Sequence, residues 1–288
     1  MKRIGVIANC GKPHSGEVLE RLERKALEQK ITLVTCDSTG DALTRAETVR
    51  PEEMGREADV LLALGGDGTM LHAVRLINGA DTPVLGVNLG SLGFMTSVTE
   101  EELEYAIDVL VARRFYLSTR VMLDGRVHRD GTEIIRYTAL NDIVVGWGSS
   151  SRALVLGLSI DGEEVAQYFC DGLIVSTPTG STGHSLSAGG PIIHPQSPVL
   201  NISAICPHTL SARPLVLSDQ STIHVDILDA APQKRPLLSA DGQEEYALEK
   251  GDRLTVTRHS HPVRFVHLPE YSYFSVLRHK LHWLGNVR

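Results

Sequence analysis

The segment VLLALGGDGTMLHAVRLI, residues 60–77, passes from an apolar run through a glycine-aspartate turn into a helical pattern. Residues 60–64 are apolar throughout and indicate a strand, whereas residues 70–77 space their apolar side chains as a helix does. The intervening GGDGT, residues 65–69, contains the glycines that a tight strand-to-helix turn needs. The segment therefore predicts the strand-turn-helix unit from which parallel α/β sheets are built.

The same alternation extends over the first third of the chain. Apolar runs at 4–8, 31–35 and 83–87 predict further strands, and helical spacing at 17–29 and 101–113 predicts helices. Repeated strand, helix and strand predict a parallel sheet with helices on its faces. Ligands bind such sheets at the carboxyl ends of the strands, where the glycine-rich segments 65–69 and 88–94 fall.

From about residue 116 the pattern changes to short strands joined by turn signals. Asp124-Gly125 and Asp161-Gly162 predict two-residue hairpin turns between alternating segments. This region predicts an all-β domain resembling a β-sandwich. Residues 270–288 return to helical spacing through Phe274, Leu277, Leu281 and Trp283, and we expect them to pack back on the first domain. The predicted domains are therefore 1–115 with 268–288, and 116–267.

Composition restricts the function further. The chain has 288 residues, enough for two packed domains, and is 42% apolar and 22% charged, as globular proteins are. A net charge of −7 argues against non-specific nucleic-acid binding, which needs a positive surface. No stretch approaches the roughly 18 to 20 apolar residues of a membrane span, and the first apolar run is too short for a signal peptide. Four scattered cysteines without a CxxC pair suit a reducing compartment, so we expect a cytoplasmic protein without nucleic-acid or membrane partners.

The glycine-aspartate turn has the features of a phosphate site. Its glycines let backbone amides approach a phosphate, and the start of the helix adds a positive end. Asp67 can accept a proton from an attacking hydroxyl or hold Mg²⁺ against phosphate oxygens. The alternative is a tight turn in which Asp67 only caps the helix. The segment lacks the Lys-Ser/Thr pair of a P-loop, but GGDGT within a strand-to-helix crossover favours the phosphate site.

The longer segment DGLIVSTPTGSTGHSLSAGGP, residues 171–191, begins as an apolar strand and becomes a run of small hydroxylated residues and glycines. The alternative to a binding loop is a flexible surface loop. Apolar residues at 173–175 and 192–193 favour a defined loop with hydroxyls and amides turned toward a nucleotide. Asn141-Asp142 places an amide and a carboxylate before an apolar strand, and Asp241-Gly242-Gln243 is another polar turn; each is also a common turn sequence.

Two histidine pairs are candidate metal ligands. His259 and His261 alternate along a strand, and His279 and His282 are three apart on a helix. No cysteine or carboxylate completes a ligand set near either pair. We therefore expect solvated or packing histidines and no metal held by these side chains.

The motifs GGDGT, NLGSLGF, LNDIVV, DGLIVSTPTGSTGHSLSAGGPI and SADGQ, in this order, resemble those of NAD kinases. The resemblance covers nearly the whole chain, up to the closing LRHKLHWLG. Diacylglycerol kinases, sphingosine kinases and 6-phosphofructokinases carry loops similar to GGDGT, whereas the long segment with AGGPI is much more specific to NAD kinases.

The resemblance implies an enzyme that phosphorylates the 2′-hydroxyl of the adenosine ribose of NAD, with Mg²⁺ and with ATP or polyphosphate as donor. Asp67 would be the general base, Asn141 and Asp142 would hold the base or ribose of NAD, and Asp171 would contact its other end. The adenine pocket would be lined by Thr182, Gly183, His184, Ser185, Leu186 and Ser187. The remaining implied contacts are Gly66, Gly68, His72, Asn88, Arg152, Thr179 and Gln243. Relatives assemble as dimers or tetramers, so a homodimer or homotetramer is expected.

The chain departs from the family pattern near the NAD contacts. Asp142 replaces the usual Glu, which shortens the reach of the carboxylate by about 1.5 Å. Gly183-His184 replaces the usual Ala-Tyr, and Phe169 stands where a basic residue is common. These departures leave the catalytic Asp67 unchanged and bear on NAD contacts and on the preference between NAD and NADH.

Two other functions compete with an NAD kinase. A lipid or sugar kinase using the same GGDGT loop would need an apolar or sugar-binding groove in place of the Thr/Ser-rich segment. A non-catalytic sensor would bind NAD without reacting, against which the intact glycines around Asp67 argue.

Overall fold

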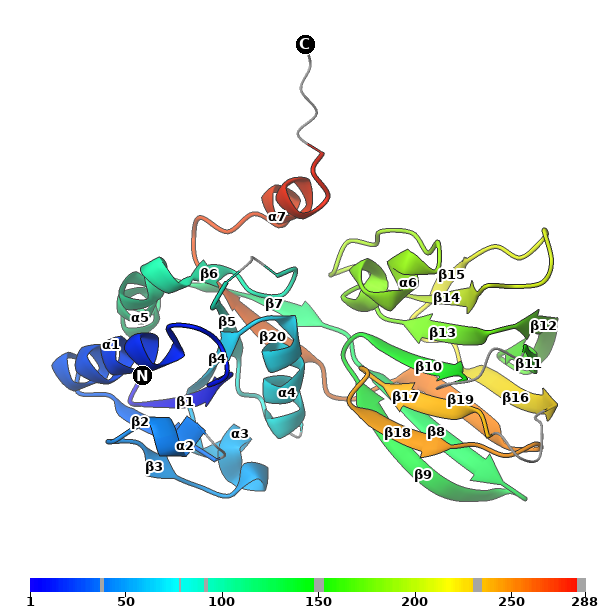
Figure 1. The fold of residues 1–288 in the computed structure, drawn as a ribbon, viewed down its shortest axis with the longest axis horizontal. Coiled ribbons are helices and arrows are strands. Elements are labelled where there is room, and N and C mark those ends of the chain that lie inside the picture. Colours follow the sequence, from blue (N-terminus) through cyan, green and yellow to red (C-terminus); the bar gives the residue numbers. More distant parts are fainter. Residues whose placement is uncertain (37–38, 78, 91–92, 148–152, 230–234, 284–288) are drawn as a thin grey trace, which may run out of the picture. The chain divides into compact units, whose positions relative to one another are not determined.

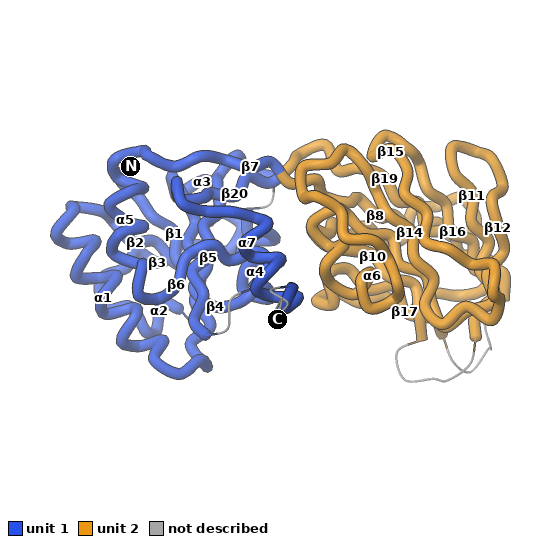
Figure 2. The backbone as a smooth tube through the Cα atoms, turned by 90° about the horizontal axis from the view of Figure 1, so that it is seen from above, with its two compact units in different colours: residues 1–119, 263–288 blue, residues 120–262 orange. Residues whose placement is uncertain are grey.

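The computed structural model describes residues 1–36, 39–77, 79–90, 93–147, 153–229 and 235–283. The chain forms two compact units, unit 1 of residues 1–119 and 263–288 and unit 2 of residues 120–262 (Figure 2). These bounds differ from the predicted ones at 115/116 and 267/268. The difference arises because β7 (Tyr116–Arg120) and β20 (Val263–His267) both extend the sheet of unit 1.

Unit 1 is built on a single sheet with the strand order β3-β2-β1-β4-β5-β20-β7, and β6 pairs with β5 (Figure 1). The pairs β1–β2, β1–β4 and β4–β5 are parallel, as the alternating pattern predicted. The other strands are β1 (Arg3–Ala8), β2 (Thr32–Thr35), β3 (Glu47–Thr48), β4 (Val60–Gly65), β5 (Val84–Asn88) and β6 (Val98–Thr99).

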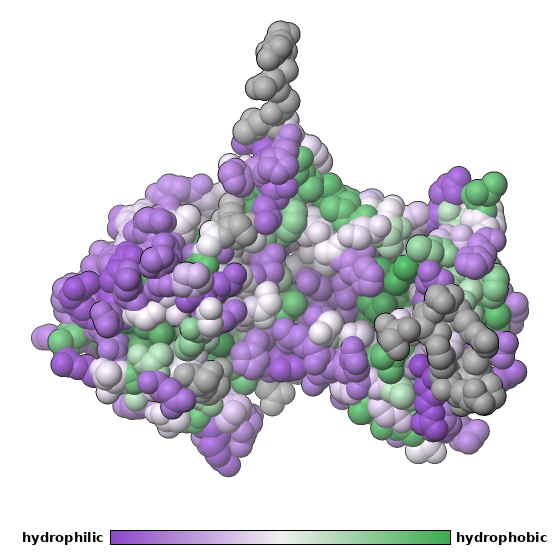
Figure 3. Space-filling view, viewed as in Figure 1, coloured by the Kyte–Doolittle hydropathy of each residue, from purple (hydrophilic) through white to green (hydrophobic). Residues whose placement is uncertain are grey.

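Helices cover both faces of this sheet. Helices α1 and α5 share one core with alternate residues of β1, β4 and β5, while hydrophilic residues predominate on their outer side (Figure 3). A Cβ at Gly86 would lie 2.8 Å from the sulfur of Met70, so α4 packs closely on the opposite face. The helices of the unit are α1 (Ser15–Glu28), α2 (Thr39–Ala42), α3 (Met54–Glu57), α4 (Asp67–Ile77), α5 (Leu103–Val111) and α7 (Tyr273–Lys280), with 3₁₀ turns η1 (Pro51–Glu53) and η2 (Glu100–Glu102). Among the residues described, no helix has the length and apolar character needed to span a bilayer.

The C-terminal segment belongs to unit 1, as predicted, although its helix ends at Lys280. The Tyr105 hydroxyl lies 2.9 Å from a carboxylate oxygen of Glu270, and the Lys280 ammonium lies 5.7 Å from the centre of the Phe94 ring. These contacts join both ends of the segment to the sheet domain.

Unit 2 is a sandwich of two antiparallel sheets. Their orders are β15-β14-β13-β10-β17-β18 and β12-β11-β16-β19-β8-β9, and apolar residues of both sheets form one core. The all-β prediction is confirmed. The elements of the unit are β8 (Leu123–Arg129), β9 (Thr132–Ala139), β10 (Asp142–Gly146), β11 (Leu154–Ile160), β12 (Glu163–Cys170), β13 (Gly172–Ser176), β14 (Val199–Ile205), β15 (Leu215–Ser218), β16 (Ile223–Asp229), β17 (Leu237–Ala240), β18 (Glu244–Ala247) and β19 (Arg253–Arg258), with η3 (Gly180–Thr182) and α6 (His184–Ser187).

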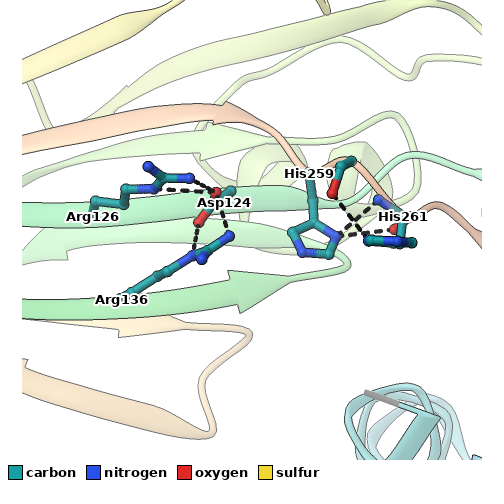
Figure 4. A network of polar contacts seen from close by, with 6 residues as sticks. Asp124, Arg126, Arg136, His259 and His261 are labelled. Atoms are coloured by element: carbon teal, nitrogen blue, oxygen red, sulfur yellow. Dashed lines mark hydrogen bonds and ion pairs between the residues drawn. The ribbon is translucent and has the colours of Figure 1, made fainter. Parts of the chain in front are cut away.

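One of the two predicted hairpin turns is correct. Asp161 and Gly162 have φ angles of 53° and 86° and join β11 to β12. The prediction at Asp124-Gly125 is wrong, because both residues lie inside β8 and the turn falls at 130–131. Asp124 is buried on this strand between the guanidinium groups of Arg126 and Arg136 (Figure 4). The paired carboxylate, not a turn, explains why an aspartate stands there.

Candidate active site

The GGDGT turn brings the end of β4 directly into the first turn of α4. The amides of Thr69 and Met70 both donate to the carbonyl of Gly66, at 3.0 and 3.1 Å. A Cβ at Gly65 would lie 2.1 Å from the hydroxyl of Thr69, so the first glycine is required for this close approach. The start of an 11-residue helix is thereby exposed at the carboxyl end of the sheet.

The Asp67 carboxylate is held by a second loop of unit 1. The backbone amides of Phe94 and Met95 each donate to it at 3.0 Å. A Cβ at Gly93 would lie 2.1 Å from one of its oxygens. Gly93 and Phe94, which end the NLGSLGF motif, therefore position Asp67 together with Met95, a role that the sequence reasoning missed. A carboxylate oxygen can accept two hydrogen bonds, so each oxygen of Asp67 retains a lone pair beside the amide that it accepts.

Asn88, at the end of β5, supports the same loop. Its side chain is buried, and its amide donates to the carbonyl of Gly90 at 2.6 Å. Gly90 has φ +144°. The structure thus gives Asn88 a local contact within the loop that follows β5.

A cavity of about 460 Å³ lies beside the GGDGT turn. Three predicted site residues line it together, Gly66, Gly68 and His72. Asn9 and Lys12, which the sequence reasoning missed, also line it from the loop after β1. The available signal was topological, because β1 is the parallel neighbour of β4 and both strands end at the same edge. A cation, a histidine and the start of a helix around one cavity suit a phosphorylated ligand.

In unit 2, Asn141-Asp142 lies against the start of the long segment. The amide of Thr177 donates to the carbonyl of Asn141 at 2.9 Å, and the hydroxyl of Thr177 to that of Leu140 at 2.6 Å. A Cβ at Gly180 would lie 2.1 Å from the carbonyl oxygen of Asn141, so only glycine fits there. Within the described residues, the side-chain oxygens of Asn141 and Thr179 are buried without a hydrogen-bond partner. Two unpaired acceptors in one place are consistent with a ligand that supplies donors.

Asp241 organises the Asn141-Asp142 segment. Its carboxylate accepts the backbone amides of Leu140, Asn141 and Asp142 at 2.8, 2.7 and 3.2 Å. Asp241 and Gly242 have φ angles of 53° and 64° in the turn between β17 and β18. In this turn the backbone amide of Gln243 donates to the carbonyl of Ala240. The expected turn is therefore present, and its carboxylate has a second role that the sequence reasoning missed.

Two buried carboxyl groups meet at this point. Burial, together with the charge of Asp241, raises the pKa of Asp142 to about 7. Burial also raises the pKa of Asp241, although its three backbone hydrogen bonds act in the opposite direction. Asp142 is consequently able to donate as well as accept a hydrogen bond near neutral pH.

The long segment is a defined structure and not a flexible loop. The hydroxyl of Thr177 accepts the amide of Gly180 at 3.1 Å, and that of Ser181 accepts the amide of Ile193 at 3.0 Å. The short elements η3 and α6 follow in the region predicted to line the adenine pocket. Among its residues, Gly183, His184 and Ser187 are exposed, Thr182 and Leu186 are partly exposed, and Ser185 is buried.

Asp171 lies at the far end of β13 from Asn141. Asp142 is paired with Ser176, whereas Gly146 is paired with Gly172, next to Asp171. Asn141 and Asp171 are therefore separated by about the length of β13. Phe169 is 51% exposed and lies edge-on to the His208 ring at 4.7 Å. Arg152 lies outside the described residues.

The histidine pairs do not form a metal centre in the described part of the chain. His259 Nδ1 lies 3.0 Å from the carbonyl of His261, whose own Nδ1 lies 3.0 Å from the Ser260 hydroxyl (Figure 4). Among the residues that the structure describes, no group of three or more His, Cys, Asp or Glu side chains is placed to hold an ion.

Comparison with known proteins identifies relatives over both units. The family models described as the ATP-NAD kinase N-terminal and C-terminal domains match residues 4–115 and 140–268. An NAD kinase of Moorella thermoacetica is 43% identical over 281 residues, covering 98% of this chain and 89% of that protein. An NAD kinase of Citrifermentans bemidjiense is 39% identical over 286 residues, covering 98% and 99%.

Two solved structures share the fold. The crystal structure of yeast NADH kinase complexed with NADH matches with a TM-score of 0.91 and 26% identity, covering 100% of this chain and 89% of that one. An NAD kinase from Archaeoglobus fulgidus in complex with ATP matches with a TM-score of 0.78 and 24% identity, covering 98% and 100%.

Proposed function

The chain belongs to the NAD kinase family, and we propose that it transfers a phosphoryl group from ATP to the 2′-hydroxyl of the adenosine ribose of NAD. The observation that carries the proposed chemistry is the placement of Asp67 at the start of α4, next to a cavity lined by Lys12 and His72. The proposal assigns phosphoryl transfer to unit 1 and NAD recognition to unit 2.

In the proposed reaction Asp67 is the general base. As the ribose oxygen forms a bond to the γ-phosphorus, the bond from that phosphorus to ADP breaks and ADP leaves with the electron pair. The hydroxyl proton moves to a carboxylate oxygen of Asp67, which the amides of Phe94 and Met95 hold in one orientation. Phosphoryl transfer depends mainly on such positioning and on charge neutralisation.

The cavity beside GGDGT supports the donor assignment. The lysine ammonium of Lys12 and the start of α4 would neutralise the donor phosphates, whether of ATP or of polyphosphate. Mg²⁺ usually binds through one or two carboxylates together with substrate phosphates, and Asp67 supplies one such carboxylate. When bound, the ion would supply further charge neutralisation of the phosphate oxygens.

In unit 2 we assign NAD recognition to groups at both ends of β13. Asn141 and Asp142 would bind the base or ribose, Asp171 the other end of the dinucleotide, and His184 and Ser187 the adenine. The unpaired oxygens of Asn141 and Thr179 support this assignment, because ribose hydroxyls and base amino groups would satisfy them.

A direct assay tests the proposal. Purified protein is incubated with Mg²⁺, NAD or NADH, and either ATP or polyphosphate, and NADP or NADPH is quantified by a coupled dehydrogenase. We expect NADP from NAD and ATP. If NAD binds but no donor yields product, the chain is a non-catalytic NAD sensor. If a lipid or a sugar offered in place of NAD is phosphorylated instead, the chain is a lipid or sugar kinase.

The expected homodimer or homotetramer and the cytoplasmic location also remain proposals. Light scattering at several protein concentrations tests the assembly, and cell fractionation tests the location. A monomer at every concentration would contradict the first.

A further inference from the structure

The side chain of Ser185 is directed into the interior of unit 2, toward β14. It is the buried residue of α6, with no exposed surface. Its hydroxyl accepts a hydrogen bond from the side-chain amide of Asn201 at 2.8 Å and lies 3.4 Å from the Ser203 hydroxyl. The resemblance placed Ser185 among the ligand contacts, whereas the structure directs its hydroxyl toward β14.

Asn201 stands at the centre of this contact. It lies on β14 with no exposed surface, and its amide also donates to the Ser203 hydroxyl at 2.9 Å. Within the described residues, its side-chain oxygen is buried without a hydrogen-bond partner. An apolar side chain would avoid that cost, so packing alone does not account for an amide here.

The cluster of Ser185, Asn201 and Ser203 leaves little room for movement. A Cβ at Gly190 would lie 2.4 Å from the Ser185 hydroxyl and 2.9 Å from that of Ser203. The amide of Gly190 donates to the carbonyl of Ser185 at 2.8 Å, which closes the chain over the cluster.

Helix α6 depends on contacts with the rest of unit 2, such as those of Ser185 with β14. It is a single turn of 4 residues without a side-chain cap, and helices this short are not stable on their own. Its exposed residues are His184, directly before Ser185, and Ser187, two residues after it. Because all three belong to the same helical turn, a contact that fixes Ser185 also fixes the direction of His184 and Ser187.

We propose that Asn201 is a positioning residue for NAD binding, which acts through the Ser185 hydroxyl to hold His184 and Ser187 in their binding orientation. The inference rests on the proposed function, because it takes α6 as part of the NAD site. Asn201 itself touches no substrate in this proposal.

The test compares Asn201→Ala, Ser185→Ala and the double variant. Because each single variant releases α6, we expect the KM for NAD to rise about tenfold in both, with kcat changed less and the KM for ATP unchanged. The double variant should not exceed the worse single variant, since both remove the same link. Ile202→Ala, on the same strand but facing the sandwich core, is the matched control and should lower Tm without raising the KM for NAD.

Two results would overturn the inference. A lowered Tm with an unchanged KM for NAD in both single variants would reduce the cluster to a structural role, and additive effects in the double variant would show that Asn201 does not act through Ser185. If Asn201→Ala does not fold, Ser185→Ala, which removes one hydroxyl, decides the matter. NAD affinities measured by calorimetry allow the same comparison of the variants with the wild type, and they do not require turnover. A wild-type protein that binds NAD but yields no NADP would contradict the proposed reaction and leave this test valid.

Discussion

Asp67 must keep its place and also accept a proton in the proposed reaction. The two amides from the 94–95 loop orient its carboxylate but do not use all of its lone pairs. We expect Asp67→Asn to retain NAD affinity and to lose turnover by roughly 10² or more, as for removal of a general base. Steady-state kinetics and NAD titration measure both, with Asp81→Asn, 98% exposed in the same unit, as the control. Near wild-type turnover would reassign Asp67 to helix capping or metal binding.

Asp142 illustrates how burial changes the protonation of one residue. Burial, with a contribution from Asp241, raises its pKa from 3.8 to about 7, so the folded state holds a proton that the unfolded state releases. The contribution of this proton to stability is complete below about pH 4 and is lost as the pH rises through about 7. Asp142→Asn should therefore become more stable relative to wild type as the pH rises, by on the order of 4 kcal/mol between pH 4 and pH 8.

Urea unfolding at several pH values measures this difference. Asp229→Asn, whose side chain is 69% exposed in the same unit, is the control and should show no such trend. A stability difference independent of pH would mean that Asp142 is ionised in the folded protein.

At the scale of elements, the contact between residues 140–142 and the long segment, residues 171–191, depends on Gly180. Gly180→Ala would place a methyl group 2.1 Å from the carbonyl oxygen of Asn141, which is backbone and cannot rotate away. We expect a Tm lowered by several degrees and a KM for NAD raised at least about tenfold, because the displaced segment carries the proposed NAD contacts.

Gly157→Ala, on β11 of the same unit, is the control for this prediction. Its Cβ would meet the end of the Leu228 side chain at 3.3 Å, which can rotate away, and its three nearest atoms are all side-chain atoms. Calorimetry and initial rates compare the two variants. If both behave alike, the contact between Gly180 and Asn141 does not position the segment.

The elements also show which features of the fold could be predicted from the sequence. The strand and helix on either side of GGDGT, and the sandwich of the second unit, were predicted because periodicity and turn residues are local signals. Local signals misplaced the turn at Asp124-Gly125, where two arginines pair with a buried carboxylate. They also missed that Asp241 holds residues about 100 positions away, because hydrogen bonds between distant segments leave no periodic trace.

For the whole molecule, the two units have separate apolar cores, so each is expected to unfold as its own cooperative unit.

A ligand stabilises the part of the protein that binds it, by about 2.7 kcal/mol at a hundred times its Kd. With NAD assigned to unit 2 and the donor phosphates to unit 1, hydrogen exchange should slow at 140–142 and 177–187 when NAD is added. Exchange should slow at 8–12 and 65–72 when Mg²⁺ and ATP are added.

Mass spectrometry of peptic fragments resolves these segments. Lys12→Gln should remove the protection by ATP and keep the protection by NAD. Protection by ATP that survives in Lys12→Gln would remove Lys12 from the proposed donor site, and protection by ATP confined to unit 2 would contradict the assignment of the donor to unit 1.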